Sequence, residues 1–271
     1  MTAEPIAATD VTDAVLVTRS GTTATVILNR PSRKNAMDQQ GWRSLQNAVE
    51  NLAEDDTVRA VIVTGALGNF CAGADIGSGA RDEHPNVRMR RITHVALALN
   101  ELPKPVIAKV EGVAVGAGMN LALACDFVVA AESARFSQIF TKRGLSLDFG
   151  GSWLLPRLIG LQQAKRLALL AEMISAEQAQ ELGLVTWVRS ADALGSFTAE
   201  LAERLAALPP IAVAQSKALL NQGAGQTLRE ALDNEARAQA VNLATADVPA
   251  AYRAFLNKSE APVYTGRWAV R

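Results

Sequence analysis

The residues best placed to do chemistry lie in two turns of small side chains, each of which follows an apolar stretch. Residues 70–76 read FCAGADI, and residues 111–126 read EGVAVGAGMNLALACD and pass into a helical pattern. The first amides of a helix lack internal partners and carry the positive end of its dipole, so the N–H of Ala117 is expected to face a negative oxygen. With a second donor from the upstream turn, this amide makes an oxyanion hole, which stabilises charge on a carbonyl oxygen.

A dinucleotide cofactor is the first alternative, because the sequence GAG at 116–118 follows a strand and opens a helix. Leu121 occupies the place of the third glycine of that fingerprint, and no acid ends a second strand between Glu132 and Asp148. These departures disfavour a nicotinamide cofactor and favour paired oxyanion donors. Taken alone, the turns also leave open a purely structural reading, in which the small residues serve close helix packing.

Composition narrows the class of protein. The chain has 271 residues, of which 49% are hydrophobic, and its 27 Lys and Arg balance its 27 Asp and Glu, which argues against a nucleic-acid partner. Cys71 and Cys125 have small or apolar neighbours, a setting typical of reduced cytoplasmic core thiols and not of a disulfide framework or a metal site. No apolar run approaches the roughly 20 residues of a membrane span. Residues 1–13 carry acids where a signal peptide has bases, and we expect a flexible tail there and no membrane partner.

Strand and helix patterns that position these turns alternate over residues 14–189 and predict an α/β body. Asn35 stands where an N-cap is expected for the first helix. Residues 77–85 mix glycine, charge and proline and are expected to form a mobile loop. The predicted strands cover 15–19, 24–28, 59–64, 106–110, 127–130 and 185–188, and the predicted helices cover 37–52, 86–102, 150–159 and 161–171.

The remaining part, residues 190–271, has a helical pattern and a tail from Lys258 onward. Leu, Ala and Val gather on one face of these amphipathic segments, which predicts packing on the body or on another subunit. The predicted helices cover 191–208, 211–221, 227–244 and 248–257.

Short motifs connect the chain to a known family. In order, they are NRP at 29–31 with NA at 35–36, FCAGADI at 70–76, KPVIA at 104–108, GAG at 116–118, CD at 125–126, ARF at 134–136, GGS at 150–152 and LPR at 155–157. Their order and spacing resemble the enoyl-CoA hydratase/isomerase (crotonase) superfamily over nearly the whole chain. The resemblance implies an α/β spiral of ββα turns with a C-terminal helical trimerisation region, and a homotrimer or a dimer of trimers. It also implies an acyl-CoA or enoyl-CoA thioester as ligand, so that coenzyme A belongs to the substrate and no separate cofactor is expected.

The resemblance also implies roles for particular residues. By motif position, the amides of Ala74 and Ala117 hold the thioester oxygen, and an alanine stands at 117 where the family commonly has glycine. A backbone donor survives that change. The residues that the resemblance places against the substrate are Ala72, Asp75, Ile76, Gly116, Asn120 and Phe140, with Arg33 and Lys258 as weaker candidates for the nucleotide phosphates.

The groups that move a proton depart from the hydratase pattern. Hydratases of the family use two glutamates, and this chain has Asn120 and Phe140 at those positions, neither of which shuttles a proton at neutral pH. Asp148 falls where related isomerases keep an acid, among Leu147, Phe149 and Trp153. Apolar surroundings raise the pKa of such a carboxyl group and a helix start lowers it, and the sequence leaves that balance open. The structural alternative is that Asp148 is the N-cap of the helix at Gly150.

These residues lead to a hypothesis in acyl-CoA or fatty-acid metabolism. The chain is expected to move a carbon–carbon double bond, with Asp148 as acid and base and the Ala74 and Ala117 amides as oxyanion donors. Enoyl-CoA hydratase activity is the first alternative, with Asn120 orienting a water. A non-catalytic acyl-CoA carrier is the second, because two expected acids are missing. A hydrolase or dehalogenase with Asp148 as nucleophile is the third.

Overall fold

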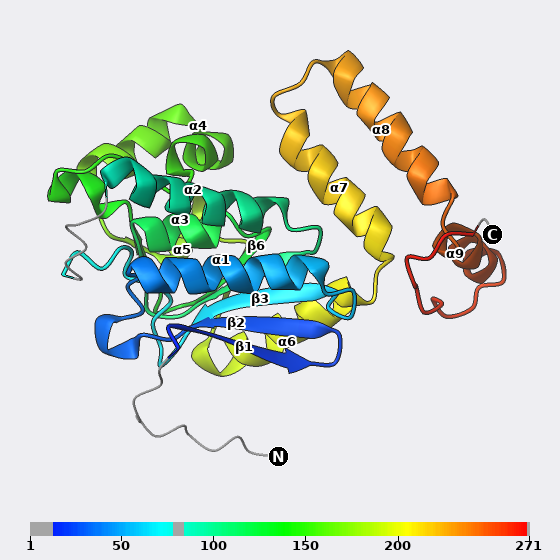
Figure 1. Cartoon of the computed structure of the whole chain (residues 1–271), viewed down its shortest axis with the longest axis horizontal. Coiled ribbons are helices and arrows are strands. Elements are labelled where there is room, and N and C mark those ends of the chain that lie inside the picture. Colours follow the sequence, from blue (N-terminus) through cyan, green and yellow to red (C-terminus); the bar gives the residue numbers. More distant parts are fainter. Residues whose placement is uncertain (1–12, 78–83, 270–271) are drawn as a thin grey trace.

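Apolar β-branched stretches build the central sheet in the computed structural model, which describes residues 13–77 and 84–269 (Figure 1). In the described residues this sheet has six strands in the order β1-β2-β3-β4-β6-β9. β1 pairs antiparallel with β2, and every later neighbour in the sheet is parallel. The strands are β1 Val15–Ser20, β2 Thr23–Leu28, β3 Ala60–Gly65, β4 Val106–Val110, β6 Phe127–Ala131 and β9 Trp187–Arg189. The predicted hairpin and buried strands are therefore confirmed.

A second, smaller sheet is made of β5 (Val113–Val115), β7 (Arg135–Ser137) and β8 (Ile174–Ser175). β5 and β7 are parallel, and β7 and β8 are antiparallel. The sequence patterns did not single out these strands, because two or three residues are too few to show an alternation of period two. β5 leads directly into the helix that starts at Ala117, so this sheet carries the second small-residue turn.

Two helical layers cover the main sheet. Alternate residues of β3 point to opposite faces, as the strand period requires. Val61 and Val63 join the larger core with residues of α1 and α2, whereas Ala60 and Ile62 face a second core formed with α6. Figure 1 shows α1 and α6 on opposite sides of the strands. The helices of the body are α1 Gln39–Glu54, α2 Pro85–Glu101, α3 Ala117–Leu123, α4 Gly151–Leu170, α5 Ala176–Glu181 and α6 Ala191–Ala206, with 3-10 turns η1 Pro31–Arg33 and η2 Ile139–Arg143.

The C-terminal helices after α6 extend away from this body (Figure 1). They are α7 Pro210–Gly223, α8 Leu228–Leu243 and α9 Asp247–Leu256, and α7 and α8 lie side by side. Lys217 ties α7 to the body through an ion pair with Asp126 (Nζ to Oδ2, 2.9 Å). Large apolar side chains remain exposed along this extension, at Leu220, Leu228, Leu243, Phe255, Leu256 and Val263. Although α6 belongs to the predicted helical region from residue 190, it packs on the sheet.

Most predicted helices agree with the structure, with two points of detail. The predicted helices over 150–159 and 161–171 are separated at Gly160 as expected, since its φ of 73° and ψ of 158° are not helical; both belong to the range labelled α4. The N-cap of α1 is Asp38, whose carboxylate accepts from the Gly41 amide, so the expectation of an Asn35 cap is wrong. Residues 1–12 and 78–83, which include most of the expected tail and the expected mobile loop, lie outside the described residues.

No helix in the described parts of the chain combines the length and the apolar character needed to cross a membrane.

Candidate active site

The two small-residue turns lie directly against each other. The amide of Phe70 donates to the carbonyl of Glu111, and the amide of Cys71 donates to that of Val113. The amide of Val115 donates back to the carbonyl of Cys71 at 2.9 Å. These bonds align the first turn along β5, so that Ala74 and Ala117 follow on neighbouring backbones.

Glycine makes this close approach possible. Gly73 has a φ of +93°, and a Cβ there would lie 2.7 Å from the carbonyl oxygen of Val115 and 3.6 Å from the nitrogen of Ala117. A Cβ on Gly118 would lie 2.2 Å from the carbonyl oxygen of Cys71. A side chain at either position would force the turns apart, because main chain and not a flexible side chain is in the way.

The amides of Ala74 and Ala117 are both available. Ala117 is the first residue of α3, so its N–H has no partner within the helix. Ala74 forms an isolated bridge to Met37, but the two bonds of that bridge use Gly73 and Asp75 and leave its own N–H unused. Neither amide donates a hydrogen bond within residues 13–77 and 84–269. The site therefore has two unused donors on adjoining turns, the minimum that an oxyanion hole needs.

Asp148 is half-buried and its side chain caps no helix. The N-cap of α4 is Gly150, in the left-handed conformation with φ of 80° and with no side-chain hydrogen bond, so the alternative of an Asp148 cap is wrong. The Oδ1 atom of Asp148 is buried without a hydrogen-bond partner in the described residues. Burial raises the pKa of this carboxyl group to about 6, and no charged neighbour contributes. Of the two opposing effects on the Asp148 pKa that the sequence left open, burial therefore outweighs the helix start.

The raised pKa of Asp148 predicts where activity falls in acid. A carboxyl group that accepts a proton must first be ionised, so turnover is expected to rise with pH through a midpoint of about 6. A solvent-exposed aspartate would give a midpoint near its ordinary value of about 4. The pH dependence of kcat and kcat/KM between pH 4.5 and 8 measures the midpoint. A flat profile over that range would contradict a titrating Asp148.

Asn120 and Phe140 fill the positions at which hydratases of the family have glutamates. Asn120 is fully buried, its Nδ2 donates to the carbonyl oxygen of Asp148 and its Oδ1 accepts from Gln138, so both polar atoms of the amide already have a protein partner. An amide also cannot accept a proton from water at neutral pH. Phe140 is buried against the second turn: a Cβ on Gly116 would lie 3.6 Å from its ring. Gly116 has a φ of +56° and supports the turn before Ala117.

The other residues of the first turn shape it or line its rim. Asp75 pairs with Arg30 (Oδ2 to Nη2, 2.9 Å), and its Oδ1 accepts from the amide of Gly77. Ala72 donates through its amide to the carbonyl of Lys34. Ile76 is 78% exposed, which leaves it free to contact a ligand at the rim. Asp75 thus helps to fix the turn, through a partner, Arg30, that lies far away in the chain.

Arg33 and Lys258 do not meet within one chain. Arg33 belongs to the exposed turn η1 beside the first small-residue turn, and Lys258 follows α9 in the C-terminal extension. Figure 1 places these two elements at opposite ends of the molecule. One chain therefore brings Arg33 near the candidate site and leaves Lys258 remote from it.

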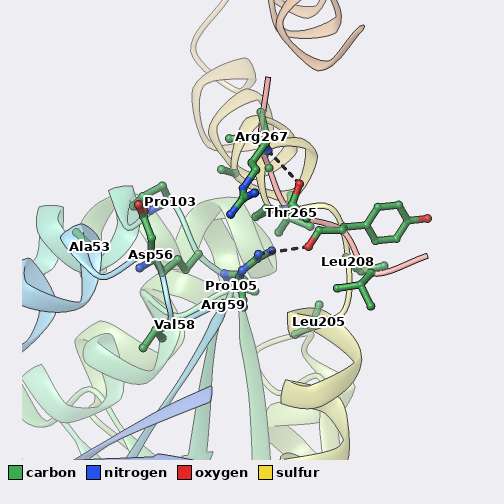
Figure 2. Close-up of a pocket in the computed structure, with 18 residues that line it drawn as sticks. Ala53, Asp56, Val58, Arg59, Pro103, Pro105, Leu205, Leu208, Thr265 and Arg267 are labelled. Carbon is green, nitrogen blue, oxygen red and sulfur yellow. Dashed lines mark hydrogen bonds between the residues drawn. The ribbon is translucent and has the colours of Figure 1, made fainter. Parts of the chain in front are cut away.

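Three of the cavities in the described residues lie beside α4 or along the C-terminal extension. One of about 280 Å³ lies between α2 and the start of α4; its lining includes Phe149, Gly150 and Trp153 but not Asp148. Two larger ones, of about 620 and 840 Å³, lie between the body and the C-terminal extension. Figure 2 shows the first of these, where Arg59 donates to the carbonyl of Tyr264 (3.3 Å).

The two cysteines are free and buried. Burial raises the pKa of Cys71 to about 12 and moves the pKa of Cys125 upward as well. At neutral pH both thiols stay protonated, as expected of core residues and not of nucleophiles.

Sequence reasoning missed Gln138 and Gly151. Gln138 is fully buried between the apolar neighbours of β7 and η2, and its Oε1 has no hydrogen-bond partner in the described residues. Its neighbours in the sequence, ARFSQIFTKR at 134–143, gave no signal of this position. Gly151 stood within a recognised motif, but its contact with Asn120 became visible only in the structure.

The two-sheet spiral, the adjoining small-residue turns and the C-terminal helices together define the crotonase fold. The chain belongs to the enoyl-CoA hydratase/isomerase family, whose pattern it matches over residues 18–267. It is 39% identical to the 1,2-epoxyphenylacetyl-CoA isomerase of Escherichia coli, covering 90% of this chain and 95% of that protein. It is 38% identical to a probable enoyl-CoA hydratase of Rhodobacter capsulatus, with coverage of 90% and 95%. The crystal structure of an enoyl-CoA hydratase from Bacillus anthracis superposes with a TM-score of 0.89 at 34% identity, over 94% of this chain and all of that one.

Proposed function

We propose that this chain isomerises an enoyl-CoA thioester by shifting its carbon–carbon double bond. The Ala74 and Ala117 amides hold the thioester oxygen while Asp148 takes a proton from one carbon. The electron pair of the broken C–H bond enters a dienolate, whose charge rests on the held oxygen. Asp148 then returns the same proton to a carbon farther along the chain, so the substrate gains and loses no atoms.

The observation that carries the proposal is the half-buried, unpartnered carboxyl group of Asp148, in a loop that Asn120 connects to the helix of the second turn. Burial brings the pKa of Asp148 to about 6, close to neutral pH, which suits a group that must both accept and return a proton. Adding water is better served by a second group that accepts a proton from the water, and Asn120 and Phe140 cannot do this at neutral pH. These residues therefore fit best a reaction in which one group, Asp148, both takes and returns the proton.

Hydratase activity is the first alternative. Relatives with similar identity are named for hydration, among them the probable enoyl-CoA hydratase of Rhodobacter capsulatus, whereas the Escherichia coli relative is named an isomerase. The names alone do not separate the two activities. Isomerisation is favoured because neither Asn120 nor Phe140 can accept a proton from water.

A carrier that binds acyl-CoA without turnover is the second alternative, and a hydrolase or dehalogenase is the third. An Asp148 that only capped α4 would favour the carrier, and the uncapped, unpartnered carboxyl group favours catalysis instead. A nucleophilic Asp148 would form a covalent acyl intermediate, which mass spectrometry of the quenched protein would detect. We expect no such adduct.

We further propose that the chain acts as a homotrimer or a dimer of trimers. The exposed leucines of the C-terminal extension support this, because an isolated chain seldom leaves such apolar faces in water. Fatty-acid or related acyl-CoA metabolism and a cytoplasmic location stay predictions.

A panel of CoA thioesters tests the function. The protein is incubated with 2-enoyl-, 3-enoyl- and 3-hydroxyacyl-CoAs, including aromatic acyl groups, and products are followed by mass and absorbance. We expect interconversion of 2- and 3-enoyl-CoA at unchanged mass. A product heavier by one water would identify a hydratase, and binding without any product would identify a carrier.

A further inference from the structure

Asn120 joins the two segments that surround Asp148. It lies one turn of α3 after Ala117 and is fully buried. Its Nδ2 donates to the main-chain carbonyl oxygen of Asp148 at 2.9 Å, and its Oδ1 accepts from Nε2 of Gln138 at 2.8 Å. The side chain therefore connects the helix of the oxyanion turn to the loop that carries the carboxyl group.

The main-chain carbonyl of Asp148 determines which way both amides face. A carbonyl oxygen only accepts, so Asn120 must present its NH₂ group there and its oxygen to Gln138. Gln138 must then present its own NH₂ group, which leaves its Oε1 buried without a partner in the described residues. The fold thus retains an unfavourable orphan acceptor in order to orient Asn120.

The loop that Asn120 holds is strained. Phe149 and Gly150 follow Asp148 with φ angles of 48° and 80°, and the left-handed region is unfavourable for a bulky residue such as Phe149. The Phe149 ring packs against Trp42 with centroids 5.4 Å apart. Strained backbone persists where its surroundings hold it, and such strain gathers at functional sites.

Gly151 gives Asn120 the space to reach this loop. A Cβ at Gly151 would lie 2.4 Å from Nδ2 of Asn120 and 2.9 Å from its Oδ1. Since that contact is with the buried and doubly bonded amide, a side chain at 151 would displace Asn120. The glycine at the start of α4 therefore belongs to the same arrangement.

We propose that Asn120 is a positioning residue for Asp148: oriented by Gln138 and admitted by Gly151, its amide holds the Asp148 main chain so that the carboxyl group keeps its buried place. The inference rests on the proposed function, in which Asp148 moves the proton. It also explains the asparagine at this position. An ionised glutamate has no hydrogen to donate to the Asp148 carbonyl, whereas Asn120 does.

Asn120→Ala, Gly151→Ala and the double variant test this role by steady-state kinetics with the substrate that the unmodified chain turns over. We expect each single change to lower kcat by about 10- to 10²-fold, the scale of a misplaced catalytic group, with KM nearly unchanged. Water that enters the loosened loop is expected to move the acidic limb of the pH profile to lower pH. The double variant is expected to lose no more than the worse single one, because both changes break one contact.

Two further variants complete the experiment. Gly195→Ala lies in α6 with nothing within 4 Å of its Cβ, and it is the matched control, expected to keep the kcat and pH profile of the unmodified chain. Gln138→Met removes the donor to Asn120 together with the orphan acceptor, so it carries the test if Asn120→Ala does not fold. We expect it to show the same loss of kcat and the same shift.

The outcomes separate this inference from the proposed function. Unchanged kcat and pH profile in the folded Asn120→Ala or Gln138→Met variant, alongside an inactive Asp148→Asn variant, would overturn the positioning role alone. Full turnover by Asp148→Asn would overturn the proposed function and the inference with it.

Discussion

Asp148→Asn is expected to lower kcat by about 10²–10⁴-fold, the contribution of a well-placed acid–base group. The replacement keeps the size of the side chain but cannot accept a proton at neutral pH. Affinity for the acyl-CoA substrate is expected to change little, because the Ala74 and Ala117 amides remain. Single-turnover kinetics and a direct binding titration measure the two quantities separately.

Folding stability gives this variant a second readout. The pKa of Asp148 is raised by burial from 3.8 to about 6, so its contribution to stability is fully present below pH 3.8 and is lost as pH rises through 6. Asparagine carries no charge to bury, and at pH 7 the Tm of Asp148→Asn is expected to equal or exceed that of the unmodified chain.

A matched control is Asp233→Asn, which removes an exposed carboxyl group of α8 and is expected to leave turnover unchanged. Undiminished turnover by Asp148→Asn would remove Asp148 from the mechanism and return the choice to a site built from the amides alone. Lost turnover together with lost substrate affinity would point to a binding role for the carboxyl group.

The sequence predicted those parts of the fold that depend on long local patterns. The β-branched run that became β3 and the amphipathic pattern of α1 were found because each extends over enough residues to show its period. Asn35 was misjudged for the opposite reason. It precedes a helix, but its side chain donates to the carbonyls of Ala66 and Asn69, partners that no local pattern reveals.

In the candidate site, too, the sequence predicted the features that have a local pattern and missed those that depend on tertiary contacts. Gly73 and Gly118 were recognisable as places of close backbone approach, since small residues after a strand are a local signal. The sequence did not show that the Asp148 side chain caps no helix. That outcome depends on two left-handed residues, Phe149 and Gly150, after which α4 starts at Gly151. The role of Asn120 depends in turn on Gln138, whose contact with it is set by the tertiary fold.

Ala117→Pro is expected to lower kcat/KM by about 10²–10³-fold, the cost of losing one oxyanion donor. Ala117 is the first residue of α3, where proline suits the helix and removes an N–H that the helix itself does not use. Pro85 and Pro210 already occupy the first positions of α2 and α7. The proline ring places a carbon where the amide hydrogen pointed, so the proposed oxygen site loses its donor and part of its space.

Ala191→Pro is the matched control for this change. Ala191 is the exposed first residue of α6, and Ser190 before it has φ of −60° and ψ of 156°, an extended conformation that proline accepts in the next residue. We expect unchanged kinetics and a similar Tm for the control, and a similar Tm but little turnover for Ala117→Pro. If Ala117→Pro folded, bound acyl-CoA and kept its kcat/KM, the thioester oxygen would have to be held elsewhere than at the start of α3. Because the amide of Ala74 acts on the same oxygen, that result would also remove the reason for pairing the two turns.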